Sequence, residues 1–595
     1  MSLYHETADV LSASPSGGNL KTRIFSNVKK LKSPPQTVYA LASETCKWSS
    51  VLKEVVDNSE LLRHERKLTP VLALLLVHDF LLAKKGIALP ASHGLRIAIE
   101  RHKARLTSEL TRARLRRKVG SIDALRQLVA VESLVEAGAH PRWVRVNTIK
   151  TTLREQLDTT FKDFEQVTNL DDVIRSTTGK AYYVDEHIPN LLGLSPLFEI
   201  TKTRAYASGA VIIQDKASCF PAYLLDPGPE DGDVIDSCAA PGNKTTHVAS
   251  LVMLQSSVGE PRKVYAFEKD PYRAKTLEKM VKLAGADAVT TLNPGQDFLK
   301  VDPKSPLYKD VGALLLDPSC SGSGIVGRDA MPTIHLPESG TQTSADTKTP
   351  NRKRKRETNA TTNGDDEGGG NKKKKKENEK EEILVDDDGK ELVVNSPKEL
   401  HERLEALSQF QLTLLLHALS FPSARRVTYS TCSVHGEENE GVVLRVLASE
   451  VARKRGWRVL RREEQVNGMR EWPVRGDEKL VVDHANPHSL WKVNFEEVAE
   501  ACIRSYKDDG RGVMGFFVAA FVRDPSAASA EEEKEEARAE TGDHETTVKV
   551  GSIAGNKRGK KKGKRKEKQE TIQEEERKVE VVEDGADDSW DGFDD

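Results

Sequence analysis

Between about Gly209 and Gly324, short runs of β-branched residues alternate with segments of helix length. The runs include VIIQDKAS, GDVIDSC, KVYAFEKD and VGALLLDPSC, and the segments between them carry apolar residues at helical spacing. Strands that alternate with helices in this way are typical of a parallel sheet covered by helices. The sequence therefore predicts an α/β domain of the Rossmann-like type.

The chain on either side of this domain has a different composition. Residues 1–137 carry apolar residues at helical spacing with basic residues between them, which predicts an α-helical, basic N-terminal domain. Residues 138–208 include the alternating segment PRWVRVNTIKTT and predict a small α+β module. The α/β domain spans 209–524, with an insertion at about 329–398, and a charged tail occupies 525–595.

The insertion consists mainly of Thr, Asn, Gly and charged residues. A segment of this length and composition inside a compact domain is expected to be disordered, and the same holds for the tail. Beyond the insertion, the amphipathic segment LHERLEALSQFQLTLLLHALSFP and the strand-like segments RRVTYSTCSV and GVMGFFVAAFVR resume the α/β pattern. The insertion is therefore expected to interrupt one domain rather than to separate two.

Charge in this chain of 595 residues is nearly balanced overall, with 90 Lys and Arg against 92 Asp and Glu, but it is segregated along the sequence. Basic runs lie at 351–356, 372–376 and 557–568, and the chain ends in EDGADDSWDGFDD. Such runs are typical of nuclear or nucleolar targeting signals and of nonspecific contacts with RNA.

The stretch from Glu100 to Val119 is also strongly basic, and two interpretations of it remain open. The side chains can face a phosphate backbone, or they can form the solvated face of a helix.

Several classes of protein are disfavoured by what the sequence lacks. Its six cysteines form no C-x-x-C pair and no cluster with metal-ligand spacing, so neither a zinc site nor a disulfide framework is expected. No apolar run reaches the length of about 18 residues that a membrane span requires. We expect an intracellular, soluble protein without a bound metal.

The turn after the predicted strand VID is the first candidate binding site. Strand ends, glycines and helix N-termini meet the ligand in Rossmann-like sheets, so small residues are needed at this point. The segment is neither GxGxxG nor GxxxxGK[ST], which disfavours a P-loop enzyme. The candidate cofactor residues of this turn are Cys238, Ala239, Ala240, Pro241, Gly242, Asn243 and Lys244.

Polar residues at further strand ends extend this candidate site. Glu268 ends KVYAFEKD, where such folds place an acid on ribose hydroxyls, and Arg273 follows it closely enough to cover an adenosine. Asp297 is positioned to hold an adenine amino group, and Asp317, after the strand GALLL, can meet a cationic methionine moiety. One such acid alone is more often simply solvated, but their order around CAAPGNKT favours a nucleoside cofactor.

Two cysteines follow predicted strands on the same rim of the sheet. Cys320 lies in DPSCSGSG and Cys432 in TYSTCS, and both are flanked by turn residues suited to exposing a side chain. Methyl transfer to C5 of cytosine requires an activated thiolate near the cofactor, because addition of sulfur at C6 makes C5 nucleophilic. From the residues alone, either thiol can be the attacking group.

The motifs DSCAAPGNKT, DPSCSGSG and YSTCS followed by HGEENE resemble the signature set of the Nop/Sun family of RNA cytosine-5 methyltransferases. The resemblance covers about Pro141 to Arg523 without the insertion. It implies S-adenosyl-L-methionine as the cofactor, Cys432 as the nucleophile, and Cys320 as the residue that assists product release. It also implies that Asp317 contacts the cytosine and the methionine end of the cofactor.

Within the family, the basic helical N-terminus, PRWVRVNT, QDKAS and the HALSFP-to-STCS stretch are similar to the eukaryotic branch that modifies large-subunit ribosomal RNA of the 25S and 28S type. This similarity implies an RNA-binding role for 138–208, rRNA or a pre-ribosome as the partner, and a nucleolar location. We presume a monomer.

Three alternatives remain. The same chemistry can act on tRNA or another RNA, because nothing in these motifs reads a nucleotide sequence. A ribosome-assembly scaffold with a vestigial cofactor site is disfavoured because both cysteines and Asp317 are present. A DNA methylase would depend on Cys320 alone.

Overall fold

The computed structural model describes residues 2–13, 19–25, 31–255, 262–325, 331–338, 382–385, 391–394, 396–483 and 494–524. The three basic runs and the charged tail predicted to be disordered lie outside these residues.

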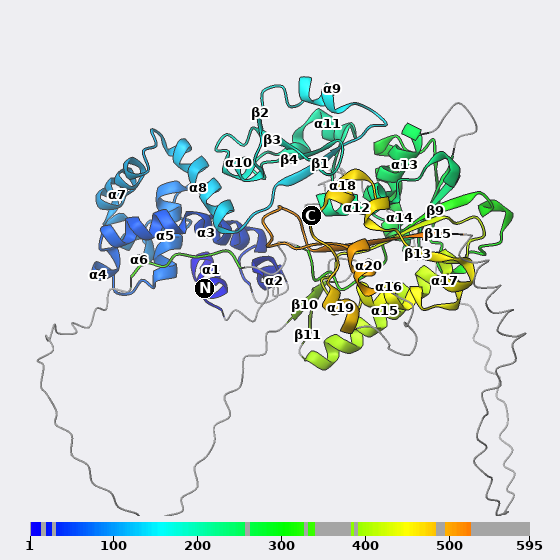
Figure 1. The fold of residues 1–595 in the computed structure, drawn as a ribbon. Helices are drawn as coiled ribbons and strands as arrows, with labels where there is room; N and C mark the ends of the chain where they lie inside the picture. The colour runs from blue at the N-terminus through cyan, green and yellow to red at the C-terminus, as the bar shows by residue number, and fades with distance from the viewer. Residues whose placement is uncertain are drawn as a thin grey trace, which may run out of the picture. The chain divides into compact units, whose positions relative to one another are not determined.

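Helices form the N-terminal part of the chain and pack around one apolar core (Figure 1). The helix Pro70–Leu82 (α5) is buried along most of its length, and its N-terminus is capped by the Thr69 hydroxyl, which accepts from the backbone N–H of Leu72. Around it lie α1 (Leu3–Ser12), α2 (Leu20–Phe25), α3 (Pro35–Asn58), α4 (Leu61–His64), α6 (Gly94–Glu100), α7 (Lys103–Arg116) and α8 (Ile122–Glu136).

A five-stranded sheet with strand order β2-β3-β4-β1-β5 follows. Its elements are β1 (Arg142–Val146), α9 (Leu153–Asp158), β2 (Glu165–Val167), α10 (Leu170–Arg175), β3 (Ala181–Val184), β4 (Leu191–Leu194), α11 (Arg204–Ala207) and β5 (Val211–Ile213). Because β5 pairs with β1 in antiparallel register, VII belongs to this sheet. The border predicted at 208/209 therefore lies before the last strand of the module.

A second, larger sheet has the order β13-β15-β12-β9-β6-β7-β8, with β14 paired to β15. The strands are β6 (Asp233–Asp236), β7 (Val264–Glu268), β8 (Thr290–Pro294), β9 (Val311–Leu316), β12 (Arg426–Thr431), β13 (Trp457–Val459), β14 (Ile503–Ser505) and β15 (Phe516–Arg523). From β12 to β8 neighbouring strands are parallel, whereas β15 is antiparallel to its partners. The α/β class predicted from the alternating pattern is thus confirmed.

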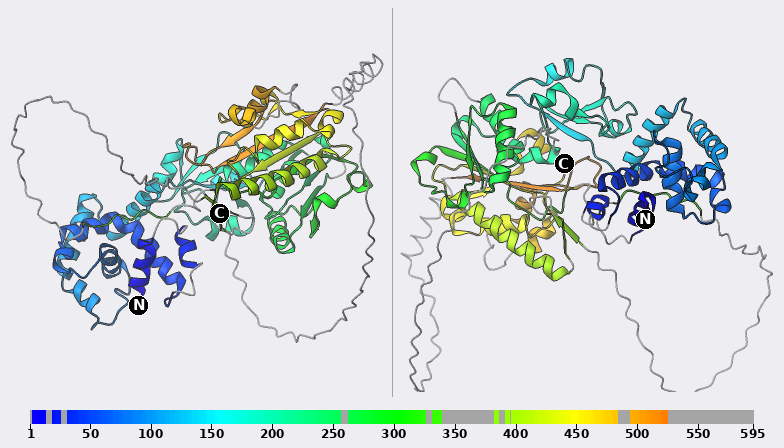
Figure 2. Two further views of the ribbon diagram at one scale, coloured as in Figure 1. Left: turned by 90° about the horizontal axis from the view of Figure 1, so that it is seen from below. Right: turned by 180° about the vertical axis from the view of Figure 1, so that it is seen from behind.

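Helices cover both faces of this sheet (Figures 1 and 2). They are α12 (Lys216–Leu225), α13 (Asn243–Gln255), α14 (Pro271–Ala284), α15 (Pro397–Leu419), α16 (Glu440–Leu447), α17 (Glu450–Arg455), α18 (Asn467–Glu471), α19 (Glu478–Asp483) and α20 (Phe495–Ala501), with short 3-10 helices at Ile200–Lys202, Pro229–Asp231, Phe298–Lys300, Pro306–Tyr308 and Arg462–Glu464.

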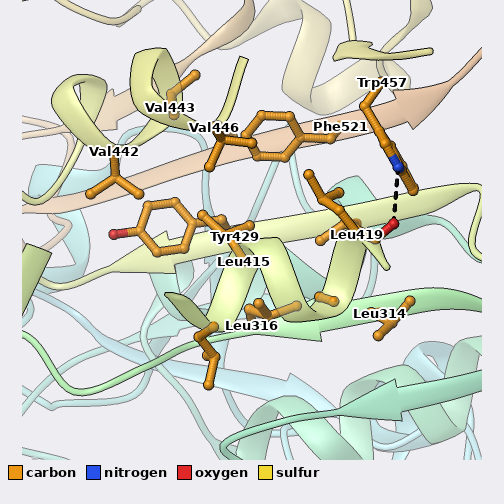
Figure 3. Packing of buried hydrophobic residues seen from close by; sticks show 14 of the residues in the cluster. Leu314, Leu316, Leu415, Leu419, Tyr429, Val442, Val443, Val446, Trp457 and Phe521 are labelled. Atoms are coloured by element: carbon orange, nitrogen blue, oxygen red, sulfur yellow. Dashed lines mark hydrogen bonds between the residues drawn. The ribbon is translucent and has the colours of Figure 1, made fainter. Parts of the chain in front are cut away.

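The strand β9 shows how the two faces are filled. Its residues Leu314 and Leu316 belong to the core shared with α15 and α16, whereas Ala313 and Leu315 belong to the core shared with α12, α13 and α14. Figure 3 shows the first of these cores, in which the Trp457 indole N–H donates to the carbonyl oxygen of Leu419 at 3.2 Å. A run that is apolar throughout, such as VGALLL, fits a strand buried on both faces.

Two stretches inside the range expected to be disordered have a defined place. In 331–338 the backbone N–H of His335 donates to the Ser49 hydroxyl of α3 at 3.0 Å, and the His335 ring lies 2.8 Å from Glu136 of α8. The strands β10 (Glu382–Val385) and β11 (Glu391–Val394) pair in antiparallel register. The range 329–398 thus includes these contacts, and the disorder of the insertion stays a prediction. None of the helices among the described residues is long and apolar enough to cross a membrane.

Candidate active site

The carboxyl ends of β6, β7, β9 and β12 lie along one edge of the larger sheet, because these strands are parallel. Each is followed by a segment that the sequence singled out: the turn 238–244, Glu268 at the end of β7, Asp317 and Cys432. A shared edge brings residues together that are far apart in the sequence.

The turn 238–244 leads directly from β6 into α13. It contains a cis peptide bond between Ala240 and Pro241, and Gly242 adopts a φ of 114°. A Cβ at Gly242 would lie 3.0 Å from the Cβ of Met280 on α14, so glycine allows the turn to pack against that helix. The Thr245 hydroxyl fixes the turn to the strand end by donating to Asp236 Oδ2 at 2.7 Å.

Glu268 and Arg273, which were predicted to bind the cofactor, lie against this turn. One carboxylate oxygen of Glu268 accepts from the backbone N–H of Ala240 at 3.3 Å and the other from that of Asp270 at 2.8 Å. Arg273 donates to the carbonyl oxygen of Ala240 at 3.1 Å. Both side chains thus help to shape the turn itself.

Asp297 lies beyond β8, at the next position along the same edge of the sheet. Its Oδ1 accepts from the backbone N–H of Leu299 and caps the short helix Phe298–Lys300. Its Oδ2 is 3.3 Å from the Lys269 ammonium. The contacts of Asp297 are therefore with its own loop and with Lys269, not with the turn 238–244.

Lys244 and Asp317 form a partly buried ion pair, with 2.8 Å between Nζ and Oδ2. The Ser430 hydroxyl donates to the other oxygen of Asp317 at 2.5 Å, so three strand-end segments meet at this carboxylate. Burial opposes the charge of Lys244, but Asp317, with Cys432 and Asp236 nearby, raises its pKa above the ordinary value. The ammonium charge is thereby held next to Cys432.

Negative charge also converges on the turn. Burial raises the pKa of Asp236 to about 7, with Asp317 adding to the rise against the hydrogen bond from Thr245. The pKa of the Cys238 thiol is raised by burial and by the charges of Asp236, Asp317 and Glu268. Three carboxylates therefore surround one small-residue turn.

The two cysteines predicted to react are brought together. Their sulfur atoms are 3.0 Å apart, although 112 residues separate them in the sequence. Their loops are joined by the backbone N–H of Gly324, which donates to the carbonyl oxygen of Cys432 at 2.9 Å. The hydrogen bond to Cys432 and burial raise the pKa of Cys320 well above its usual range. Of the pair, Cys320 is thus held as the thiol.

Three family models match separate parts of the chain: the N-terminal domain of NOL1/NOP2/Sun domain family member 5 at residues 36–125, the ferredoxin-like domain of the same protein at 140–214, and the 16S rRNA methyltransferase RsmB/F family at 222–350. The 25S rRNA (cytosine-C(5))-methyltransferase rcm1 of Schizosaccharomyces pombe is 36% identical over 87% of this chain and 91% of its own length. The chain belongs to the NOL1/NOP2/Sun domain family.

The chain is also similar to a further relative and, at much lower identity, to a solved structure. The 28S rRNA (cytosine-C(5))-methyltransferase of Mus musculus is 35% identical over 75% of this chain and 80% of its own length. A solved methyltransferase homologue from Pyrococcus horikoshii is 19% identical, with a TM-score of 0.39 over 68% of this chain and 99% of its own. The resemblance on which the sequence interpretation depended is confirmed.

The basic stretch of this family member, from Glu100 to Val119, is largely neutralised. Arg116 and Arg117 both pair with Glu54, at 2.6 Å in the case of Arg117. Further pairs join Arg101 with Glu65, Arg105 with Glu60 and Arg112 with Glu109. Of the two interpretations, these pairs favour a solvated helix face.

Sequence reasoning missed the residues that support the site from behind. Ser430, Glu438, Gln411 and Arg504 contact the reactive loops only because distant segments fold onto one another. The segment HGEENE was the one available signal, because it contains Glu438 and directly follows the Cys432 loop. In the described part of the chain, no group of three or more His, Cys, Asp or Glu residues could hold a metal ion.

Proposed function

We propose that this protein methylates C5 of a cytosine in large-subunit ribosomal RNA, with S-adenosyl-L-methionine as the methyl donor. The observation that carries the chemistry is the 3.0 Å separation of Cys320 and Cys432 at the rim of the sheet, beside the turn 238–244. The large-subunit RNA is proposed because the relatives from Schizosaccharomyces pombe and Mus musculus are named 25S and 28S rRNA (cytosine-C(5))-methyltransferases.

The chemistry of the side chains around the turn fits this cofactor. Asp236, Glu268 and Asp317 surround Cys238, and carboxylates suit both the hydroxyls of a ribose and the cationic methionine end. We propose that residues 238–244, with Glu268, Arg273, Asp297 and Asp317, hold the cofactor. When bound, S-adenosylmethionine supplies an electrophilic methyl group on a sulfonium sulfur.

Cys432 is the proposed nucleophile. Its thiolate forms a bond to C6 of the cytosine, and the electron pair displaced from the C5–C6 bond makes C5 nucleophilic toward the methyl group. The Lys244 ammonium interacts with Cys432, and the raised pKa of Cys320 keeps the second sulfur neutral at this stage. Asp317, held by Lys244 and Ser430, is proposed to contact the cytosine.

Product release requires that a base accepts the C5 proton, and that the electron pair of the C5–H bond re-forms the C5–C6 double bond and expels the Cys432 thiolate from C6. We assign assistance in this step to Cys320, whose sulfur lies 3.0 Å from that of Cys432. The two cysteines thus act in successive steps.

Two single substitutions test this order. Cys432→Ala is expected to abolish methyl transfer to RNA, because no sulfur remains to activate C5. Cys320→Ala is expected to leave a covalent protein–RNA adduct that survives denaturation and migrates as a slower band with labelled RNA. Methylation by Cys432→Ala at the normal rate would overturn the mechanism.

The RNA target is tested separately. Bisulfite sequencing of total RNA with and without the protein identifies each cytosine that depends on it. The proposal expects the lost signal in large-subunit rRNA, whereas a lost signal confined to tRNA would replace the substrate and leave the chemistry intact. We further propose a monomeric, nucleolar enzyme, which imaging of a fluorescent fusion in cells can test.

A further inference from the structure

Glu438 is a fully buried carboxylate behind the pair of cysteines, in the loop between β12 and α16. Its Oε1 accepts from the backbone N–H of Ser321 at 3.0 Å and from the side-chain amide of Gln411 at 3.0 Å. Ser321 directly follows Cys320. The carboxylate is therefore bonded to the loop that presents the Cys320 sulfur.

Gln411 extends this contact to the other side of Cys320. Its amide Nε2 also donates to the carbonyl oxygen of Ser319 at 3.0 Å, so the residues before and after Cys320 are both held. The Tyr429 hydroxyl lies 3.0 Å from Gln411 Oε1 and also contacts the backbone carbonyl oxygen of Glu438. A network from α15, β12 and the loop after Cys432 thus fixes the position of Cys320.

The charge of Glu438 acts on Cys320. Its Oε2 is buried and has no hydrogen-bond partner in the described part of the chain, so the carboxylate is only partly satisfied there. The pKa of Cys320 is raised by the hydrogen bond to Cys432 and by burial, with the charge of Glu438 adding to the rise, and the pKa of Tyr429 is raised by burial and by Glu438. The other titratable or charged groups that face this cluster are Cys432, Asp317 at the end of β9, Lys244 on α13 and Arg445 on α16.

Groups of opposite charge thus interact with the two cysteines. The Lys244 ammonium acts on Cys432, and the Glu438 carboxylate acts on Cys320. Glu438 thus adds its charge to the burial of Cys320 in distinguishing two sulfurs that are 3.0 Å apart.

We propose that Glu438 is a positioning residue of the reaction: it fixes the Cys320 loop and, through its buried charge, keeps Cys320 a neutral thiol while Cys432 attacks. The inference rests on the proposed function, in which Cys432 is the nucleophile. It adds a residue that touches neither substrate nor cofactor and acts through Cys320.

A titration of Cys320 in the Cys432→Ala background tests the charge directly and needs no enzymatic activity. The rate of alkylation of Cys320 by iodoacetamide is followed against pH by peptide mass spectrometry, with and without Glu438→Gln. The Gln side chain can still accept the hydrogen bonds from Ser321 and Gln411, so mainly the charge is lost. We expect alkylation of Cys320 at one pH to rise about tenfold, which corresponds to one pH unit.

Two matched variants separate charge from shape. Glu438→Asp keeps the charge with a shorter side chain, and its alkylation profile is expected to stay close to that of the parent. Glu437→Gln removes a neighbouring charge that is only half-buried, and it is expected to leave the profile unchanged. Two results would overturn the proposal. The first is a pH profile of Cys320 alkylation that is the same in Glu438→Gln as in the parent. The second is a profile that Glu438→Asp shifts to lower pH by as much as Glu438→Gln does.

The consequence for turnover is measured in the chain with both cysteines. In Glu438→Gln the alkaline limb of the pH profile of kcat is expected to move to lower pH, because Cys320 then competes with Cys432 for the negative charge. The KM for S-adenosylmethionine is expected to stay the same. An unmoved kcat profile contradicts the role of Glu438, whereas methylation by Cys432→Ala at the normal rate contradicts the proposed mechanism, in which Cys432 is the nucleophile.

Discussion

At the scale of single residues, sequence reasoning found the candidate site residues that directly follow a strand. It missed the side chains that hold the loops of these residues in place. Asp317, Cys320 and Cys432 each follow an apolar run that ends in turn residues, and this local pattern is visible in the chain. Glu438 contacts Ser321 across 117 residues. Such a contact depends on strand order and register, which local patterns do not encode.

Asp236 provides a prediction about pH. Its folded pKa of about 7 lies above that of an unfolded aspartate, so the folded state binds the proton more tightly and stability falls as pH rises from about 4 to about 7. The contribution lost over this range is about 4 kcal/mol. The free energy of unfolding, measured with urea at pH 5 and at pH 8, should fall less between these two pH values in Asp236→Asn than in the parent protein. An equal fall in both proteins would contradict the raised pKa of Asp236.

Arg504 and Glu440 form a buried ion pair next to the Cys432 loop, with exposed side-chain fractions of 1% and 0%. Arg504 also donates to the carbonyl oxygen of Val434 at 3.1 Å. Arg504→Met leaves the carboxylate buried and unpaired, so we expect a loss of about 3–5 kcal/mol in the free energy of unfolding. Denaturant titration measures it. Arg461→Met breaks a more exposed pair and should cost less than about 1 kcal/mol.

At the scale of elements, alternation of strand and helix predicted the α/β class, but pairing decided where each strand belongs. The segment VII is apolar and three residues long, and nothing in it distinguishes an edge strand of one sheet from a strand of the other. Antiparallel pairing with β1 places it in the small sheet. Similarly, 331–338 has no periodic pattern, and its contacts with α3 and α8 define it.

Gly324 joins three elements at the site. Its N–H donates to Cys432, its carbonyl oxygen accepts from the N–H of Gly515 at 2.8 Å, and a Cβ at Gly324 would lie 2.2 Å from the Gly515 oxygen. Gly324→Ala should force the two cysteine loops apart and lower kcat by at least about tenfold, since a displacement of about 1 Å already has a large effect on rate. Gly94→Ala, where a Cβ meets nothing within 4 Å, is the control. A kcat equal to that of the control would contradict this account.

At the scale of the whole molecule, the large sheet is built from two stretches of chain. The strands β6 to β9 come from before residue 338, and β12 to β15 come from after residue 396. They are joined by the parallel pair β9 and β12 and by the apolar core that lies on both. We therefore expect strand pairing and this core to hold the sheet together even without the chain that connects the two stretches.

A protease site introduced between residues 338 and 382 tests this arrangement. After cleavage, the two fragments should elute together in size-exclusion chromatography and separate only in denaturant, because β12 remains paired with β9 on one side and β15 on the other. Elution of two separate fragments under native conditions would show that the covalent link is required.

The position of β12 between β9 and β15 also sets an order of events on the ribosome. Cys320 leaves the ribosome 112 residues ahead of Cys432, an interval of roughly 6 to 22 seconds at translation rates of 5–20 residues per second. During this interval the nascent chain has the turn 238–244 and Cys320, but not the strand that carries Cys432. A chain that stops early therefore lacks Cys432, the proposed nucleophile, and on this proposal reactivity toward RNA begins only when β12 pairs with β9.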